Sequence, residues 1–514
     1  MNYTRNLNLI ITVMAALLMV ALTAHPSAAA SAPQYGGVYK IITGQTPAQF
    51  GWPPDGVGAA EYIWQPALEH LAHEYDDGTF ESVLATSWEM PADKSHIILH
   101  LRKNVKFHDG SDFDAEAVKF NLEGWVKSKR VNEWESIEVL DKYTVKVNFR
   151  KGPFENSYLT NVLAVPAIAS KVSFEKNGVE WAQANPVGTG PFKFVRHERD
   201  VRTVYAKNEN YWKPGRPYLD GVEFIYIKDP MTQSAALQTG KATCLHLDWN
   251  KQVADLKAMG FESIDGTAGV VALYPDSGNK DSPFADKRVR QALEYAINRE
   301  ALESARSFGL FKAAYQAAPH GSPFYDPTLK GYPYDSNKAR ALLKEAGFPN
   351  GFKTKIIPLP GVYDKDEMVI IQRFFSEVGI NAEIDFVDYP RYSQYRMKGW
   401  GPSALLGFPL LIDRGNPNRI MDLFYGPKRP MFPSLGLTED FYALLRKSQL
   451  TPKLDIAAVK KIIRYISDEA LMLPIRDLGQ SYLVQKGLRV HNSGHLGQSV
   501  WHRWTPGELW IEKK

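Results

Sequence analysis

Few residues in this chain have the spacing that catalysis or metal binding requires. The stretch "HLAHE" at 70–74 sets His70 and His73 three positions apart, whereas zinc-protease helices need two histidines four apart and a glutamate as base. The stretch "GKAT" at 240–243 has no hydroxyl residue directly after Lys241, so it is not a phosphate-binding loop. Both patterns are near misses, and neither predicts an active site.

Candidate nucleophiles have little support from their neighbours. The serines of "GQSY" (479–482) and "GQSV" (497–500) lack the flanking glycine of a nucleophile elbow. Cys244 is the only cysteine, and the nearby His246 is as easily its neighbour in a strand as a general base. The sequence therefore argues against an enzyme, and a secreted hydrolase is kept only as a control hypothesis.

Two further histidines could form a metal pair. His491 and His495 flank an Asn-Ser-Gly turn, but a loop pair lacks the fixed spacing of a strong metal signature. Histidines of a surface loop explain the pattern more simply. We therefore expect no metal site and no cofactor.

The composition is that of an ordinary folded protein with several domains. The 514 residues exceed what one hydrophobic core usually organises. Sixty-one basic residues against 57 acidic ones leave a net charge of only +4. A basic run such as "KSKR" at 127–130 is more simply a solvated helix face, so nucleic acid is not an expected partner.

The first 30 residues predict a signal peptide. Arg5 precedes a largely apolar stretch, and Ala28 and Ala30 give the small-x-small pattern of a cleavage site before Ser31. The alternative, a membrane anchor, fits the small-residue tail less well, and no second long apolar stretch follows. No cysteine lies near the cleavage region, so we expect no lipid anchor. The single Cys244 allows no intramolecular disulfide, and we expect a monomer in the periplasm.

The middle of the chain alternates strands with amphipathic helices. "IILHLRKNVKFHDG" (97–110) reads as a strand and a turn, and the helix "FDAEAVKFNLEGW" (113–125) follows with Asp114 as its cap. "NPVGTGPFKF" (185–194) opens a hairpin that turns near 198–200. These patterns predict mixed α/β structure.

The second half of the chain repeats this alternation. A helix is expected over 283–302 with Asp286 as cap, and another over 334–348 with Asp335 as cap. A strand, a helix and a strand then span 352–387, which predicts a right-handed βαβ unit. The predicted fold class is α/β, without internal repeats or a long linker.

Four of these stretches, in this order, resemble one family. "LATSWEMPADKSHIILHLRKNVKFHDGSDFDAEAVKFNLE", "NPVGTGPFKF" with "NENYW", "PFADKRVRQALEYAINRE" and "YPYDSNKARALLKEAG" resemble the extracellular solute-binding proteins of the dipeptide, oligopeptide and nickel class, which serve ABC transporters. The resemblance implies a large type II periplasmic binding protein fold: two lobes joined by a hinge, with the ligand buried between them. It also implies an extra subdomain in the first lobe, and no chemistry on the ligand.

This resemblance gives a domain division and a function. A peptide-like or amine-bearing solute would be captured between the lobes and delivered to the membrane permease of an ABC transporter. The alternative is a binder of nickel or another metal chelate for the same type of importer. The expected segments are a signal peptide at 1–30, lobe I at 31–76, 187–282 and 478–514, an extra subdomain at 77–186, and lobe II at 283–477.

The stretch "GFPLLIDRGNPN" at 407–418 places an acid and a base after an apolar run. The resemblance implies that Asp413 pairs with a ligand ammonium group, with Arg414 beside it. The alternatives are a local turn bond of Asp413 or a bridge to Arg414. The loop before Asp413 is longer than in dipeptide-binding members, and Lys365 or Asp366 stands where they carry an arginine for the dipeptide carboxylate. A simple dipeptide is therefore not the expected ligand.

Four aromatic residues are candidates for the walls of the ligand pocket. They are His246 and Trp249 in "GKATCLHLDWN", Trp52 in "FGWPP" and Phe408 beside the acidic loop. Aromatic walls with polar edges suit a buried organic solute. The alternative for each is a place in the core. The full set of predicted ligand-binding residues is Asp413, Arg414, Phe408, Trp249, His246 and Trp52.

Overall fold

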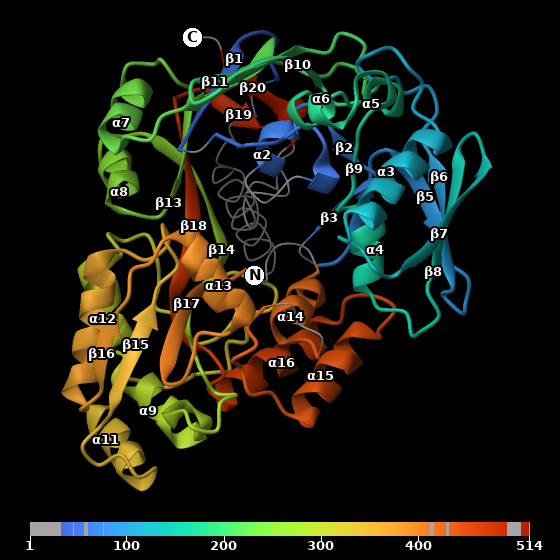
Figure 1. Cartoon of the computed structure of the whole chain (residues 1–514). Helices are drawn as coiled ribbons and strands as arrows, with labels where there is room; N and C mark the ends of the chain where they lie inside the picture. Colours follow the sequence, from blue (N-terminus) through green and yellow to red (C-terminus); the bar gives the residue numbers. More distant parts are fainter. Residues whose placement is uncertain are drawn as a thin grey trace, which may run out of the picture.

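The computed structural model describes residues 32–44, 46–55, 60–75, 77–411, 416–427, 431–490 and 505–512. In this part of the chain a mixed sheet of ten strands runs through the molecule in the order β10-β11-β12-β1-β13-β18-β14-β17-β15-β16 (Figure 1). We call the half with β10, β11, β12, β1 and β13 lobe I, and the half with β17, β15 and β16 lobe II. The strand bounds are β1 Val38–Thr43, β10 Phe192–Glu198, β11 Arg202–Lys207, β12 Gly221–Tyr226, β13 Cys244–Asp248, β14 Glu262–Pro275, β15 Lys353–Ile357, β16 Asn381–Ile384, β17 Ala404–Leu410 and β18 Leu473–Val484.

Strands β14 and β18 belong to both lobes and connect them. They are 14 and 12 residues long and pair antiparallel along almost their whole length. Their register shifts between Thr267 and Gly269 and again between Val271 and Ala272. Such irregularities bend and twist a strand, which lets the pair turn from one lobe into the other. The predicted α/β class and its two lobes are confirmed.

Helices cover the sheet of both lobes. In lobe II the side chains of β14 alternate between two apolar clusters, one containing Val270, Ala272 and Tyr274 and the other containing Val271 and Leu273. Each face is therefore sealed by its own helices. The helix bounds are α2 Ala60–Trp64, α7 Pro230–Gln238, α8 Lys251–Ala258, α9 Lys287–Ala296, α10 Arg299–Arg306, α11 Ser336–Glu345, α12 Lys365–Glu377, α13 Tyr389–Lys398, α14 Pro417–Tyr425, α15 Glu439–Gln449 and α16 Ile456–Asp468.

Most of the predicted elements are present. The β15–α12–β16 unit is parallel, as the predicted βαβ unit requires, and β10 and β11 form the expected hairpin. The prediction of a single helix over 283–302 is wrong. The structure has a 3₁₀ turn η2 at Pro283–Ala285, then α9, and a break before α10. The break occurs because the Asn298 side chain accepts the backbone N–H of Ala301 and starts a new helix.

A separate four-stranded sheet stands beside lobe I (Figure 1). Its order is β5-β6-β8-β7, and the helix α3 packs on it with Val118, Leu122 and Trp125 buried. We call this part the subdomain. Its sheet strands and helices are β5 Ala85–Glu89, β6 His96–Leu101, β7 Trp134–Asp141, β8 Thr144–Phe149, α3 Ala115–Lys127 and α4 Ser157–Leu163.

Short elements connect the subdomain, lobe I and the end of the chain. They are η1 Pro53–Asp55, β2 Glu69–His70, β3 Ala72–Glu74, β4 Phe80–Ser82, β9 Ala167–Ile168, α5 Lys171–Asn177, α6 Val179–Ala184, β19 Leu488–Val490, η3 Pro506–Glu508 and β20 Leu509–Ile511. The domain boundaries given above stay predictions. Over the described residues, none of the helices combines the length and apolar character needed to cross a bilayer.

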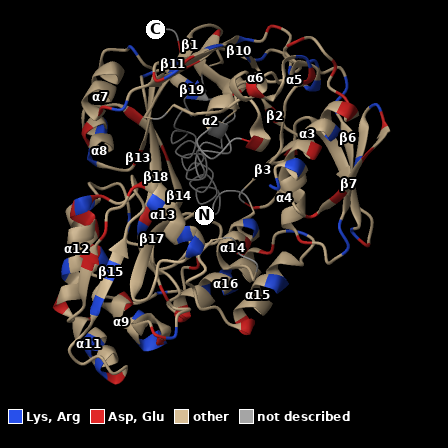
Figure 2. Ribbon diagram, viewed as in Figure 1, with Lys and Arg blue, Asp and Glu red and all other residues tan. Residues whose placement is uncertain are grey.

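Basic and acidic side chains are mixed over the helices of both lobes (Figure 2). Many ion pairs of the described residues, such as Lys251 with Asp255 and Arg373 with Glu377, lie at the surface, where each contributes little to stability. Several ionisable side chains of lobe II are instead buried, and Asp276 is one of them.

Asp276 directly follows β14 in lobe II and is only 2% exposed. Burial raises the pKa of its carboxyl to about 6, against an ordinary value near 4. Between these two pH values the folded protein keeps a proton that the unfolded chain releases, so stability falls as the pH rises. We expect the wild type to lose about 1 to 3 kcal/mol of unfolding free energy from pH 4 to pH 7 relative to Asp276→Asn.

Urea unfolding of both proteins at several pH values measures this difference. The unfolding free energy of the wild type relative to Asp276→Asn should fall as the pH rises and level off above about pH 7. Parallel curves for the wild type and Asp276→Asn would show that folding does not raise the pKa of Asp276.

Candidate functional site

Strand β13 ends where the two lobes meet. The backbone N–H of Trp249, the residue after β13, donates to the carbonyl oxygen of Gly479 on β18 at 2.9 Å. The Trp249 ring lies so close that a Cβ on Gly479 would come within 2.3 Å of it. Position 479 therefore needs a glycine, because any side chain there would displace the indole.

Trp249 is also held by polar bonds on its face of the sheet. Its Nε1 donates to Ser481 Oγ at 3.0 Å, and that hydroxyl donates to Asp265 Oδ1 at 2.6 Å. Lys257 of α8 pairs with the other oxygen of Asp265 at 2.7 Å. The predicted pocket residue Trp249 thus belongs to a chain of contacts that leads to α8.

His246 lies on the opposite face of β13 and β18, because side chains alternate along a strand. Its ring stacks on Tyr482 with 4.6 Å between centroids and 22° between planes, and Tyr62 of α2 lies 6.1 Å away. Gln480 Nε2 donates to Asp248 Oδ1 at 2.8 Å on the same face. Burial lowers the pKa of His246, so the imidazole is neutral at pH 7 and offers hydrogen bonds rather than charge.

Trp52 has a different neighbourhood. It is 6% exposed, and its ring packs against Phe120 of α3 and Phe174 of α5 at 5.3 and 4.7 Å. A Cβ on Gly124 would come within 2.7 Å of its ring. The structure thus places Trp52 in the apolar contact between lobe I and the subdomain, in a different cluster of side chains from Trp249.

Phe408 lies on β17 in lobe II. It is 8% exposed and packs edge-on against Phe424 and Phe432, each at 5.4 Å. The Arg396 guanidinium lies 5.6 Å from its ring centroid. Of the four predicted aromatic residues, Phe408 is therefore the one that lobe II contributes.

The loop that follows β17 begins at the crossing of the lobes. A Cβ on Gly269 of β14 would come within 2.0 Å of the carbonyl oxygen of Leu410, the last residue of β17. The chain resumes as α14, which Asn416 caps by accepting the backbone N–H of Asn418. Asp413 and Arg414 stand between these points and lie outside the described residues, so their ligand role stays a prediction.

One acid–histidine pair on β18, one of the two strands that cross between the lobes, was not predicted from the sequence. Asp477 of β18 is 2% exposed, and His320 Nδ1 lies 2.9 Å from its Oδ2. Tyr325 Oη lies 3.2 Å from the other nitrogen of His320. Burial raises the pKa of Asp477, while His320 lowers it. No sequence spacing marks this pair, because 157 positions separate its members.

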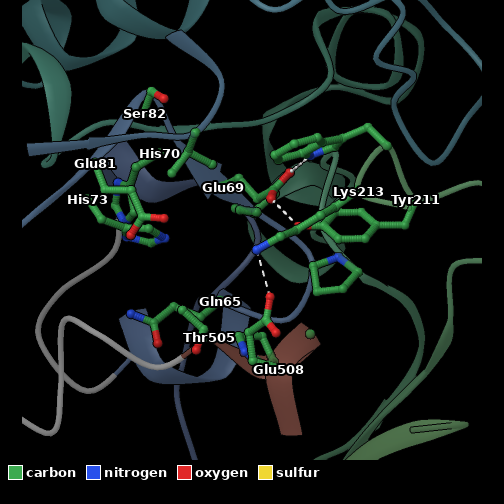
Figure 3. Close-up of a pocket in the computed structure, with 16 residues that line it drawn as sticks. Gln65, Glu69, His70, His73, Glu81, Ser82, Tyr211, Lys213, Thr505 and Glu508 are labelled. Carbon is green, nitrogen blue, oxygen red and sulfur yellow. Dashed lines mark hydrogen bonds and ion pairs between the residues drawn. The ribbon is translucent and has the colours of Figure 1, made fainter. Parts of the chain in front are cut away.

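A small cavity lies in lobe I where it meets the subdomain (Figure 3). Its volume is about 90 Å³, well below the roughly 300 to 1,000 Å³ of ligand pockets. Glu69 in its wall accepts bonds from Thr189, Tyr211 and Trp212 at 2.7 to 2.8 Å, and Lys213 pairs with Glu508 at 2.6 Å. Glu69, Lys213 and Glu508 are thus already bonded within the protein, and together with the small volume this makes the cavity a structural junction rather than the solute site.

The described residues hold no cluster of three or more histidine, cysteine, aspartate or glutamate side chains placed to bind a metal. On the face of β13 that carries His246, the polar side chains of Gln480 and Asp248 bond each other.

Comparison with known proteins agrees with this geometry. Residues 79–430 match the family described as "Bacterial extracellular solute-binding proteins, family 5 Middle". The glutathione-binding protein GsiB of Escherichia coli O1:K1 / APEC is 35% identical over 318 residues, which are 60% of this chain and 61% of GsiB. The match thus spans less than two thirds of that relative.

Two solved structures show the same fold. The periplasmic binding protein DppA from Helicobacter pylori, in complex with the peptide STSA, has a TM-score of 0.74 and 24% identity. The alignment covers 93% of this chain and 99% of DppA. NikA from Brucella suis, in complex with Fe(III)-EDTA, has a TM-score of 0.77 and 20% identity, with 92% and 100% covered. The predicted two-lobed periplasmic binding protein fold is confirmed.

Proposed function

Because the chain belongs to the bacterial extracellular solute-binding proteins of family 5, we propose that it is the solute-binding component of an ABC importer. It captures a peptide-like or amine-bearing solute between its lobes and delivers it to the membrane permease. The observation that carries this proposal is the pair of crossing strands, β14 and β18, which join two separately packed lobes. Lobes connected in this way can close around a ligand. The family is one of binding proteins rather than a class of enzymes.

The predicted signal peptide supports a location in the periplasm. In this proposal residues 1–30 are removed and the mature chain from Ser31 carries no lipid anchor and works as a monomer. Its partners are the solute and the permease subunits of the inner membrane, and nucleic acid is not among them.

Asp413 is the proposed partner of the solute's ammonium group, and Arg414 either braces Asp413 or meets an anionic group of the solute. The position of β17 supports this role, because that strand ends against the crossing strand β14. His246 and Phe408 are the proposed aromatic neighbours from lobe I and lobe II. The roles proposed for Trp249 and Trp52 rest on sequence position, since both side chains are already packed within lobe I.

Charges at the start of α12 do not favour the free carboxylate of a simple dipeptide. The family resemblance implies an arginine here in dipeptide-binding members, where this chain has Lys365 or Asp366. The nearby arginine is Arg306 at the end of α10, which pairs with Asp364 at 2.6 Å and with Asp366 at 3.2 Å. Its positive charge is thus matched by two carboxylates, which leaves less attraction for a solute carboxylate.

A panel of solutes tests the proposal through thermal and urea unfolding of the mature protein. The panel contains glutathione, short peptides, diamines and nickel and iron chelates. A cognate solute at a hundredfold excess over its dissociation constant should raise the unfolding free energy by about 2.7 kcal/mol. Glutathione is included because GsiB bears that name, and peptides because DppA was solved with one.

For each solute that stabilises the protein, the control is a matched compound that lacks the amine. Stabilisation by chelates alone would support the alternative proposal, a binder of metal chelates. In that case the chelate itself supplies the ligands of the metal. Release of a chemically altered solute would contradict a binding protein of either kind.

A further inference from the structure

The subdomain contacts lobe II at a point far along the chain from the crossing strands. The contact centres on Asn156, which precedes α4 and is 3% exposed. Its backbone N–H donates to the carbonyl oxygen of Gln449 at 2.8 Å, and its Nδ2 donates to that of Ser448 at 2.8 Å. Both acceptors lie in the last turn of α15, where helix carbonyls have no partner within the helix. Asn156 therefore caps a helix of the other lobe.

The other side of the same amide reaches the start of α14. Asn156 Oδ1 accepts from Asn416 Nδ2 at 2.9 Å and from Asn418 Nδ2 at 3.1 Å. Its second Nδ2 hydrogen donates to Thr451 Oγ1 at 3.0 Å. An asparagine side chain offers two donors and two acceptor sites, so all the hydrogen-bonding groups of the Asn156 side chain bond residues of lobe II.

Asn156 does this in place of a local bond. It occupies the N-cap position of α4, where asparagine ordinarily accepts a backbone N–H of its own helix. Its side chain makes no such capping bond. The local geometry thus gives up a standard helix cap in favour of contacts between the lobes.

Neighbouring residues extend the contact. Glu155 pairs with Arg446 of α15 at 3.1 Å. In the turn between β3 and β4, a Cβ on Gly78 would come within 2.7 Å of Leu454 Cβ of lobe II. The contact is thus a small packed surface and not a single bond.

We propose that Asn156, together with Asn416, Asn418, Ser448 and Gln449, forms an interlobe latch that sets how much of the ligand-free protein is closed. Opening the lobes separates Asn156 from the other four residues and exposes all of them to water. Each net hydrogen bond favours the bonded state by about fivefold. The inference rests on the proposed function only where it concerns solute affinity.

Because the latch acts on closure, it changes the affinity for every solute by the same factor. The apparent dissociation constant is the intrinsic one divided by the closed fraction. We expect Asn156→Ala to shift the balance toward the open form by at least about tenfold, since four side-chain bonds to lobe II are lost. Residues that contact the solute would instead discriminate between solutes.

Distance measurements on the ligand-free mature protein test the latch without any solute. Spin labels on cysteines introduced at Glu135 of β7 and Lys461 of α16, which are exposed, report the separation of subdomain and lobe II by double electron–electron resonance. The native Cys244 is fully buried and stays unlabelled. Asn156→Ala should shift the distances to longer values.

The matched control is Asn121→Ala. Asn121 is fully buried and makes three hydrogen bonds, to Ala117 and Ala169, which all stay on its own side of the contact. This control should leave the distances at those of the parent. Arg446→Gln, which loses only the half-buried pair with Glu155, should lengthen the distances in the same direction by less. Unchanged distances in both Asn156→Ala and Arg446→Gln would overturn the latch.

A binding measurement separates the latch from the proposed function. Among glutathione, a dipeptide and a diamine, every probe that binds should lose affinity by one common factor in Asn156→Ala. Unequal losses would contradict a role in closure. Absence of binding by all three probes would count against the proposed peptide-like or amine-bearing solute, and the distances in the ligand-free protein still decide whether the latch exists.

Discussion

Asp413→Asn is expected to weaken solute binding by more than about a hundredfold, which is the largest effect we expect of any single change on binding. A solute ammonium buried between closed lobes loses its water and needs an anion beside it. Removing one partner of a buried charge pair costs on the order of 3 to 5 kcal/mol. Titration calorimetry with the tightest-binding solute of the panel measures the loss directly.

The melting temperature of ligand-free Asp413→Asn should change little, because a carboxylate in an open, wet cleft contributes little to the fold. The matched control is Asp440→Asn, which makes the same change at an exposed position on α15. Binding within about threefold of the wild type would show that Asp413 is only a turn residue. A large fall in the ligand-free melting temperature would instead indicate a structural bridge to Arg414.

The largest expected effect on stability comes from Arg476→Met in the crossing strand β18. Arg476 is 8% exposed and forms two bonds, at 2.6 and 3.2 Å, to the carboxylate of Glu367 in the first turn of α12. Glu367 is only 2% exposed. The substitution leaves that carboxylate buried without its partner, so we expect the protein to lose about 3 to 5 kcal/mol of unfolding free energy.

Two further variants separate the charge from the packing. Arg476→Met combined with Glu367→Met removes both charges and should recover much of the loss, because an apolar pair can replace a buried ion pair. Lys251→Met breaks the exposed pair with Asp255 and should change stability little. Urea unfolding measures all four proteins. A double variant no more stable than Arg476→Met alone would show that the guanidinium matters for packing against Phe311 and not for charge.

Local signals in the sequence predicted much of the fold correctly. The caps Asp114, Asp286 and Asp335 start helices where expected, because a carboxylate that accepts a backbone N–H acts within one turn. The βαβ unit at 352–387 also follows from local periodicity. The helix break near Asn298 was missed because the apolar stripe continues across it, and only the cap bond to Ala301 reveals the second start.

Contacts between distant segments were beyond a single sequence. Trp249 and His246 are three positions apart and were expected to face one pocket, yet pairing with β18 places them on opposite faces of the sheet. The two asparagines around Pro417 were visible in "NPN", but their partner Asn156 is 260 positions away from Asn416. Spacing along the chain does not encode such pairs, since they depend on how complete lobes pack.

Native mass spectrometry of the protein isolated without denaturation tests the central claim most directly. The mature chain should carry one bound molecule, and denaturation should release an unaltered peptide or other amine-bearing solute of the corresponding mass. The same experiment on Asp413→Asn should show the chain mostly without that molecule. A released metal chelate without an amine, or a molecule that Asp413→Asn retains as fully as the wild type, would contradict the account.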